Sequence, residues 1–159
     1  MVMLSVIYLH GLESGQGGEK VEFLTANSMV YAPEIDYENF SYRDFKKLIK
    51  IAENCDLIIG SSAGGYLANI LATHVGCDVL LFNPAFHSRS FELVAGIKPL
   101  LDGPYYERTI ILGLEDDVID PVKTREWYVE DFDKVIEIES MGHRTPLNIF
   151  KDIYTKYFL

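Results

Sequence analysis

The chain has 159 residues, a length that predicts one domain over residues 1–159 with a single core. Hydrophobic residues (48%) and charged residues (24%) match ordinary globular proteins, and no apolar run approaches the roughly 18 residues that a membrane span needs. A formal net charge of −10 disfavours nucleic acid as a partner, because phosphate binding uses clustered Lys and Arg. We therefore expect neither a membrane protein nor a nucleic-acid-binding protein.

Short apolar runs alternate with helix-like segments along the chain. The runs are nearly continuous and rich in Val, Ile and Leu, which is typical of strands buried on both faces. The predicted strands are Leu4 to Leu9, Met29 to Ala32, Leu57 to Ile59, Val79 to Phe82, Thr109 to Leu112 and Val135 to Ile138. The predicted helices are Glu19 to Asn27, Ser41 to Glu53, Ala63 to Val75, Pro121 to Val129 and Leu147 to Tyr157. This alternation predicts a three-layer α/β fold of about six mostly parallel strands, with helices on both faces.

The segment 83–108 interrupts the alternation of strands and helices. It contains three prolines and mixes aromatic with apolar residues. Ligands of open parallel sheets bind beyond the carboxyl ends of the strands, and this segment leaves the sheet at such an end, after Phe82. We expect it to form a small cap that walls the substrate site.

A G-x-S-x-G pattern, Gly60 to Gly64, lies between a predicted strand and a predicted helix. At a nucleophile elbow the central residue has a strained backbone, and the positions two before and two after it have room for almost no side chain. Gly60 and Gly64 meet that requirement. The pattern predicts that the Ser62 hydroxyl stands exposed above the sheet. The alternative is that Ser62 only caps the following helix.

Asp116 and His143 follow the fifth and sixth predicted strands, so they should lie at the same sheet edge as Ser62. The chain order Ser, Asp, His is the order of α/β-hydrolases. His143 would be the base that removes the hydroxyl proton, and Asp116 would orient its ring. Asp117 is an alternative for the carboxylate, whereas Asp120 is better placed to cap the next helix.

An acyl-transfer site also needs donors for the negative charge that develops on the carbonyl oxygen. In this fold they are backbone N–H groups, one directly after the nucleophile and one in the loop after the first strand. Ala63 and Leu12 occupy these positions, and Gly11 precedes Leu12. His10 is expected to shape this loop, with contact to substrate as the alternative.

Two polar residues of the predicted cap, His87 and Arg89, could meet a substrate carboxylate. Exposed polar residues on loops are more often only solvated, so neither is assigned a role. His74, near the end of the helix after the elbow, is interpreted as a surface or capping residue.

The chain resembles the α/β-hydrolase superfamily and, within it, the small bacterial YqiA-type esterases. Four stretches carry the resemblance: Tyr8 to Ser14, Gly60 to Tyr66, Asn83 to Ala85 and Gly113 to Asp120. It implies a minimal sheet without the superfamily's first two antiparallel strands, and hydrolysis of short acyl esters or thioesters. Two features depart from the family: Ala63 stands where a Leu is expected, and the region after Asn83 is short.

The function that these patterns favour is a serine hydrolase that forms an acyl-Ser62 intermediate from a small ester or thioester. No metal or organic cofactor is expected. A lactonase or an amidase could use the same residues, and a binding or scaffold protein could keep the fold without turnover. Val2 to Leu9 looks like a strand rather than a secretion signal, and Cys55 and Cys77 are too few for a disulfide scaffold. We therefore expect a cytoplasmic location.

Overall fold

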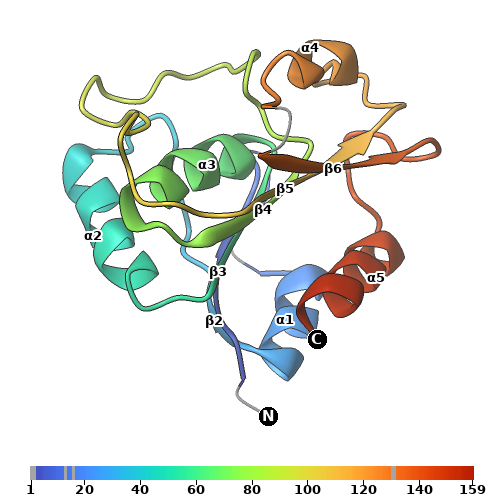
Figure 1. Cartoon of the computed structure of the whole chain (residues 1–159), viewed down its shortest axis with the longest axis horizontal. Helices are drawn as coiled ribbons and strands as arrows, with labels where there is room; N and C mark the ends of the chain where they lie inside the picture. The colour runs from blue at the N-terminus through green and yellow to red at the C-terminus, as the bar shows by residue number, and fades with distance from the viewer. Residues whose placement is uncertain (1–2, 13, 16, 130–131) are drawn as a thin grey trace.

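The computed structural model describes residues 3–12, 14–15, 17–129 and 132–159. These residues form one open sheet of six strands in the order β2-β1-β3-β4-β5-β6, and every neighbouring pair is parallel. The strands are β1 (Ser5–Leu9), β2 (Met29–Tyr31), β3 (Leu57–Ser61), β4 (Asp78–Phe82), β5 (Arg108–Gly113) and β6 (Asp133–Ile138). All six predicted strands are present, and the predicted α/β fold is confirmed (Figure 1).

Four of the five described helices cover the two faces of this sheet. Figure 1 shows α2 and α3 on one side and α1 and α5 on the other, and α4 follows the carboxyl end of β5. The helices are α1 (Glu19–Asn27), α2 (Tyr42–Ala52), α3 (Ala63–Val75), α4 (Pro121–Arg125) and α5 (Leu147–Phe158). None of the helices in the described ranges is long and apolar enough to cross a membrane.

The core is divided into two layers by the sheet. One layer joins α2 and α3 to the sheet through side chains such as Phe45 and Leu67, and the other joins α1 and α5 through Leu24 and Phe150. These side chains are at most 1% exposed. Full burial of a side chain of this size contributes about 1.5–3 kcal/mol, so the two layers explain why strands with two apolar faces are stable here.

Helix α4 ends four residues before the predicted end at Val129. Arg108 causes the difference, because its guanidinium donates a hydrogen bond to the Trp127 carbonyl and pairs with Asp133 through Nε and Oδ1 at 2.6 Å. The second Asp133 oxygen also accepts the Val129 N–H. The backbone after Arg125 is therefore bound to the start of β6 and cannot continue as a helix.

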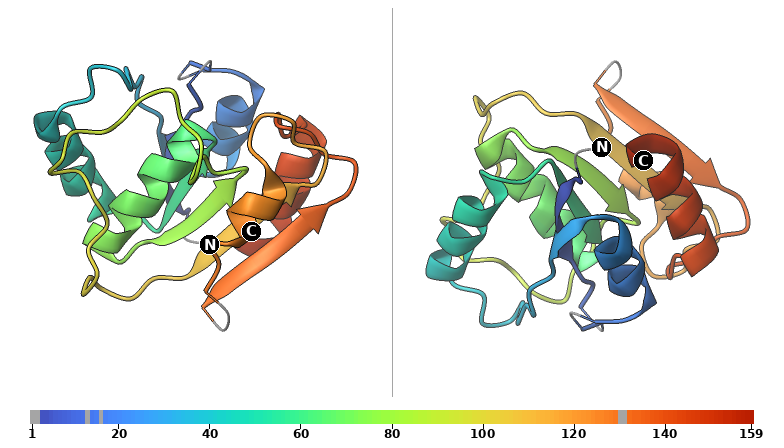
Figure 2. Two further views of the ribbon diagram at one scale, coloured as in Figure 1. Left: turned by 90° about the horizontal axis from the view of Figure 1, so that it is seen from above. Right: turned by 90° about the horizontal axis from the view of Figure 1, so that it is seen from below.

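The segment between β4 and β5 contains neither helix nor strand. Its first residues lie at the carboxyl end of the sheet, and its later part runs along the outside of α3 (Figure 2). The Leu100 N–H donates to Thr73 Oγ1 at 3.0 Å, and a ring nitrogen of His74 lies 2.9 Å from the Lys98 carbonyl oxygen. His74 therefore helps to hold the later part of this segment against α3.

Candidate active site

Ser62 lies at the turn between β3 and α3 with φ 53° and ψ −116°, in the left-handed region that residues with a side chain rarely adopt. A Cβ atom on Gly60 would clash with the Gly64 carbonyl, and one on Gly64 would clash with the Leu9 carbonyl. The Ser62 N–H donates to the Phe82 carbonyl of β4 at 3.0 Å. Its side chain makes no capping hydrogen bond to α3. The turn therefore has the geometry of a nucleophile elbow rather than of an ordinary N-cap.

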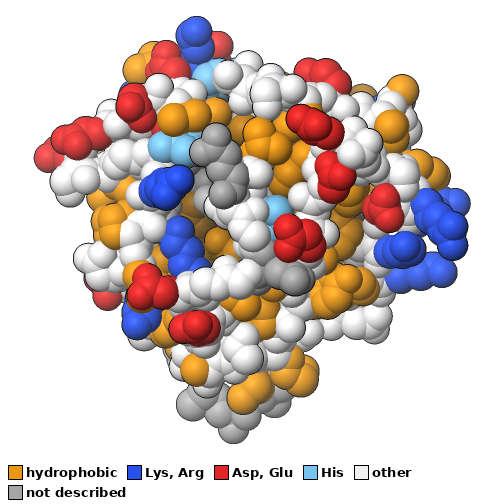
Figure 3. Space-filling view, turned by 180° about the vertical axis from the view of Figure 1, so that it is seen from behind, with side chains coloured by type: hydrophobic (Ala, Val, Ile, Leu, Met, Phe, Trp, Pro, Cys, Tyr) orange, Lys and Arg blue, Asp and Glu red, His pale blue; other side chains and the backbone are white. Residues whose placement is uncertain are grey.

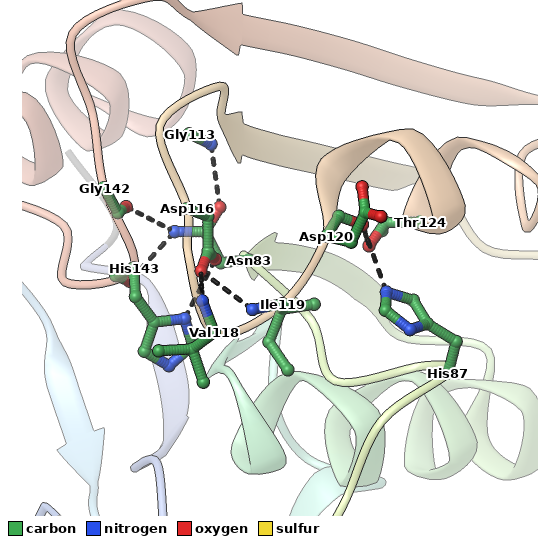
Figure 4. A network of polar contacts seen from close by, with 10 residues as sticks. All are labelled: Asn83, His87, Gly113, Asp116, Val118, Ile119, Asp120, Thr124, Gly142 and His143. Atoms are coloured by element: carbon green, nitrogen blue, oxygen red, sulfur yellow. Dashed lines mark hydrogen bonds and ion pairs between the residues drawn. The ribbon is translucent and has the colours of Figure 1, made fainter.

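Asp116 and His143 are joined by a hydrogen bond of 2.9 Å between Asp116 Oδ2 and His143 Nδ1 (Figure 4). The other carboxylate oxygen accepts the N–H groups of Val118 and Ile119, each at 2.8 Å. Burial raises the pKa of Asp116, but the hydrogen bonds from His143 and these two amides outweigh it and lower the pKa below its usual value. The ionised carboxylate accepts the Nδ1 proton, which leaves Nε2 of a neutral His143 ring as the basic nitrogen.

Asp117 and Asp120 have different environments from Asp116. Asp117 is exposed. Asp120 Oδ1 accepts the Val122 N–H at 2.8 Å and caps α4, as the sequence predicted. Of these three aspartates, Asp116 is the one bonded to His143.

Ser62 and His143 line the same cavity, which has a volume of about 500 Å³. Gly11, Leu12 and Ala63 also line it. Among the described residues, neither the Leu12 N–H nor the Ala63 N–H has a backbone or side-chain acceptor. Both amides are therefore available to a ligand in this cavity.

His10 holds the loop after β1 in place. Its Nδ1 lies 2.7 Å from the Gly11 carbonyl oxygen, and its Nε2 accepts the Ile35 N–H at 2.9 Å. An imidazole that accepts at Nε2 donates from Nδ1, so both ring nitrogens are used within the protein. The residue is 2% exposed and does not line the cavity. His10 therefore shapes the loop; the neighbouring Glu13 lies outside the described residues.

Asn83 is a site residue to which the sequence analysis assigned no role. It is 1% exposed and has a positive φ of 42°, which Asn tolerates better than most residues. Its Oδ1 accepts the Gly113 N–H at 2.7 Å, and its Nδ2 donates to the carbonyls of Gly142 and His143 at 3.0 and 2.9 Å (Figure 4). Asn83 thus ties the ends of β4 and β5 to the loop that carries His143. The sequence signal that could have pointed to Asn83 is the Asn-Pro dipeptide directly after a buried strand.

The two polar residues of the 83–108 segment differ in position. Arg89 lines the cavity, but its Nη1 donates to the carbonyls of Ala85 and Phe86 and its guanidinium lies 3.8 Å from the centroid of the Tyr66 ring. A ring nitrogen of His87 lies 3.1 Å from the Asp120 carbonyl oxygen, away from the cavity lining (Figure 4). Arg89 therefore holds its own loop against α3.

Metal-binding groups do not gather in the described part of the chain. No three His, Cys, Asp or Glu side chains there come together in an arrangement that could hold a metal ion.

Several solved structures share the fold at low sequence identity. A member of the α/β-hydrolase superfamily from Xanthomonas campestris pv. campestris is 20% identical with a TM-score of 0.70, over 98% of this chain and 99% of that one. A lidless α/β serine hydrolase from Xanthomonas campestris is 13% identical (TM-score 0.62; 97% and 81%). Acetyl xylan esterase 1 from Thermoanaerobacterium sp. JW/SL YS485 is 17% identical (TM-score 0.63; 97% and 73%).

These structures show that the chain has the α/β-hydrolase fold. No match was found among curated proteins. The sequence pattern of the family described as Uncharacterised protein family (UPF0227) matches residues 5–96, which is more than half of the chain and includes the elbow and Asn83. The resemblance to the YqiA-type group is thereby confirmed, and the chain belongs to the UPF0227 family.

Proposed function

We propose that the protein is a serine hydrolase that cleaves small carboxylic esters or acyl thioesters. Ser62 Oγ attacks the substrate carbonyl while His143 Nε2 takes the hydroxyl proton, and the negative oxygen is held by the N–H groups of Leu12 and Ala63. His143 then gives the proton to the departing alcohol or thiol, which leaves an acyl-Ser62 ester. Water, deprotonated by the same nitrogen, releases the carboxylic acid and restores Ser62.

The hydrogen bond between Asp116 and His143 carries this proposal, together with the strained backbone of Ser62, which lines the same cavity as His143. A protein that only binds a ligand has no need for a buried carboxylate that holds one tautomer of a histidine. The steps require no metal and no organic cofactor. Lactones and amides would react through the same residues, so a lactonase or an amidase is the alternative within this proposal.

The cavity favours a small substrate. Its volume of about 500 Å³ lies within the usual range for small-molecule sites, about 300–1,000 Å³. Ala85, Phe91 and Ile119 give it an apolar wall, to which we assign the acyl group.

A fluorophosphonate probe tests the proposal directly, because it phosphonylates an activated serine. We expect one adduct by intact-mass measurement in the native protein and none in Ser62→Ala. Ser61→Ala is the matched control, because it removes the adjacent hydroxyl of the same turn and should keep the adduct. An unmodified wild-type protein that also fails to hydrolyse p-nitrophenyl butyrate would favour the binding protein instead.

A further inference from the structure

The described residues that line the cavity carry positive charge, although the chain as a whole is acidic. The chain has 24 Asp and Glu against 14 Lys and Arg, and acidic side chains are spread over the face seen in Figure 3. Among the described residues, the cavity is lined by Lys20, Arg89 and Arg144 together with His143, and by no Asp or Glu. Such a local excess of one sign attracts ligands of the opposite sign.

Lys20 and Arg144 differ from Arg89 in their contacts with the described part of the chain. Arg89 donates to two backbone carbonyls and lies 3.6 Å from Glu92. Neither Lys20 nor Arg144 forms an ion pair or a side-chain hydrogen bond with any residue in the described ranges. These two cations are therefore available to a ligand.

Lys20 and Arg144 line the same cavity, and their like charges repel each other. Lys20 is half-buried, with Nζ 5.7 Å from the centroid of the Phe150 ring. Burial and, secondly, the charge of Arg144 lower the pKa of Lys20. A negative group between them would offset both effects, because it would replace lost hydration and screen the repulsion.

The two cations and Phe91 of the apolar wall lie on different sides of the sheet. Lys20 is in the first turn of α1 and Arg144 precedes α5, and these two helices cover one face. Phe91 belongs to the core layer of α2 and α3 on the other face. Ser62, at the sheet edge, lines the same cavity as these residues, so the two parts of an ester bound there would face different surroundings.

We infer that the substrate carries a carboxylate or a phosphate on its alcohol or thiol part, held by Lys20 and Arg144. This inference rests on the proposed function. His143 must protonate the leaving group, so that group lies on the side of His143, and Arg144 is the next residue. The neutral acyl group then lies against Phe91.

Esters that differ only in charge test this assignment. 3-(Butyryloxy)propionate and 3-(butyryloxy)propionamide share the acyl group and the chain length, and one is anionic. We expect kcat/KM to be about 100-fold higher for the anion, which corresponds to two charged hydrogen bonds of about tenfold each, and added salt to reduce the preference. 2-(Butyryloxy)ethyl phosphate carries a phosphate in place of the carboxylate. Whichever of the two anionic esters has the larger kcat/KM shows which anion the site prefers. Monoethyl succinate and ethyl succinamate place the same charge difference on the acyl side.

Variants identify the residues that hold the charge. Lys20→Gln and Arg144→Gln should each reduce the preference for the anionic ester by about tenfold, mainly through KM. Lys151→Gln is the matched control, because Lys151 is also on the face of α1 and α5 and has Nζ 5.5 Å from the centroid of the Phe23 ring, but does not line the cavity. It should leave the preference unchanged, and thermal melting should show that all three variants are folded.

The outcomes separate this inference from the proposed function. Equal hydrolysis of the two butyryl esters, a preference for the acyl-side anion, or a preference that survives both glutamine variants would overturn the inference. Cleavage that still depends on Ser62 would then leave the proposed function standing. A wild-type protein that cleaves none of the esters and takes up no fluorophosphonate would overturn both.

Discussion

The loops after β1 and β6 flank the cavity and each carries a histidine, but the two rings have opposite uses. His10 uses both ring nitrogens on backbone groups of Gly11 and Ile35, whereas His143 uses Nδ1 on Asp116 and has no described partner at Nε2. His10 is buried, and the His143 side chain is 22% exposed on the cavity. A histidine can act as a base only where its second nitrogen is left free and reachable.

Loss of His143 should have the largest effect on activity. His143→Gln removes the proposed base, and the loss of a triad histidine in a serine protease costs on the order of 10⁶ in kcat. We expect ester hydrolysis to fall by several orders of magnitude, to the residual rate that the oxyanion donors and substrate binding support, while the thermal melting temperature stays close to that of the wild type. Turnover of p-nitrophenyl butyrate by His143→Gln within about tenfold of wild type would contradict the assignment of His143, rather than His10, as the base.

Loss of the Asp116 carboxylate should come next. Asp116→Asn removes the acceptor that holds the His143 tautomer, and the corresponding change in a serine protease lowers kcat about 10⁴-fold. Asp117→Asn is the control, because this exposed carboxylate in the same loop should have little effect. The measurement is kcat on one p-nitrophenyl ester. If Asp117→Asn were the inactive variant, the carboxylate assignment would be wrong.

Changes at His10 should act on stability more than on chemistry. His10→Leu leaves the Ile35 N–H and the Gly11 carbonyl without their partners, and each unsatisfied buried group costs about 1–3 kcal/mol. Urea denaturation should show the lower free energy of unfolding, with activity reduced far less than in His143→Gln. His87→Leu, which loses one contact outside the cavity lining, should be nearly neutral. Complete inactivity of a stable His10→Leu protein would argue for a direct role of His10.

Much of the fold could be predicted because its signals are local. The four central strands β1, β3, β4 and β5 are almost continuous apolar runs, since both of their faces are buried, and helices α2 and α4 begin at capping residues. The end of α4 could not be predicted, because it depends on the contact of Trp127 with Arg108, which is 19 residues away in the chain. Hydrogen bonds between distant segments leave no periodic pattern in the sequence.

The candidate site divides in the same way. The elbow glycines and the order of Ser62, Asp116 and His143 could be read directly, because a turn without space for side chains admits only small residues. The role of Asn83 could not, since its three hydrogen bonds join loops that follow three different strands. The positive side of the cavity was also missed, because Lys20 and Arg144 are 124 positions apart in the sequence.

Local patterns in the sequence are enough to predict a parallel α/β sheet, a strained serine turn and the strand ends at which polar residues gather. The packed fold selects Asp116 rather than Asp117 as the partner of His143 and satisfies both ring nitrogens of His10. It also brings to the cavity two cations that form no ion pair with any residue in the described ranges. Apolar periodicity and backbone sterics act between near neighbours in the chain. The partner of a carboxylate or an imidazole is instead chosen by which loops the packed sheet brings within about 3 Å.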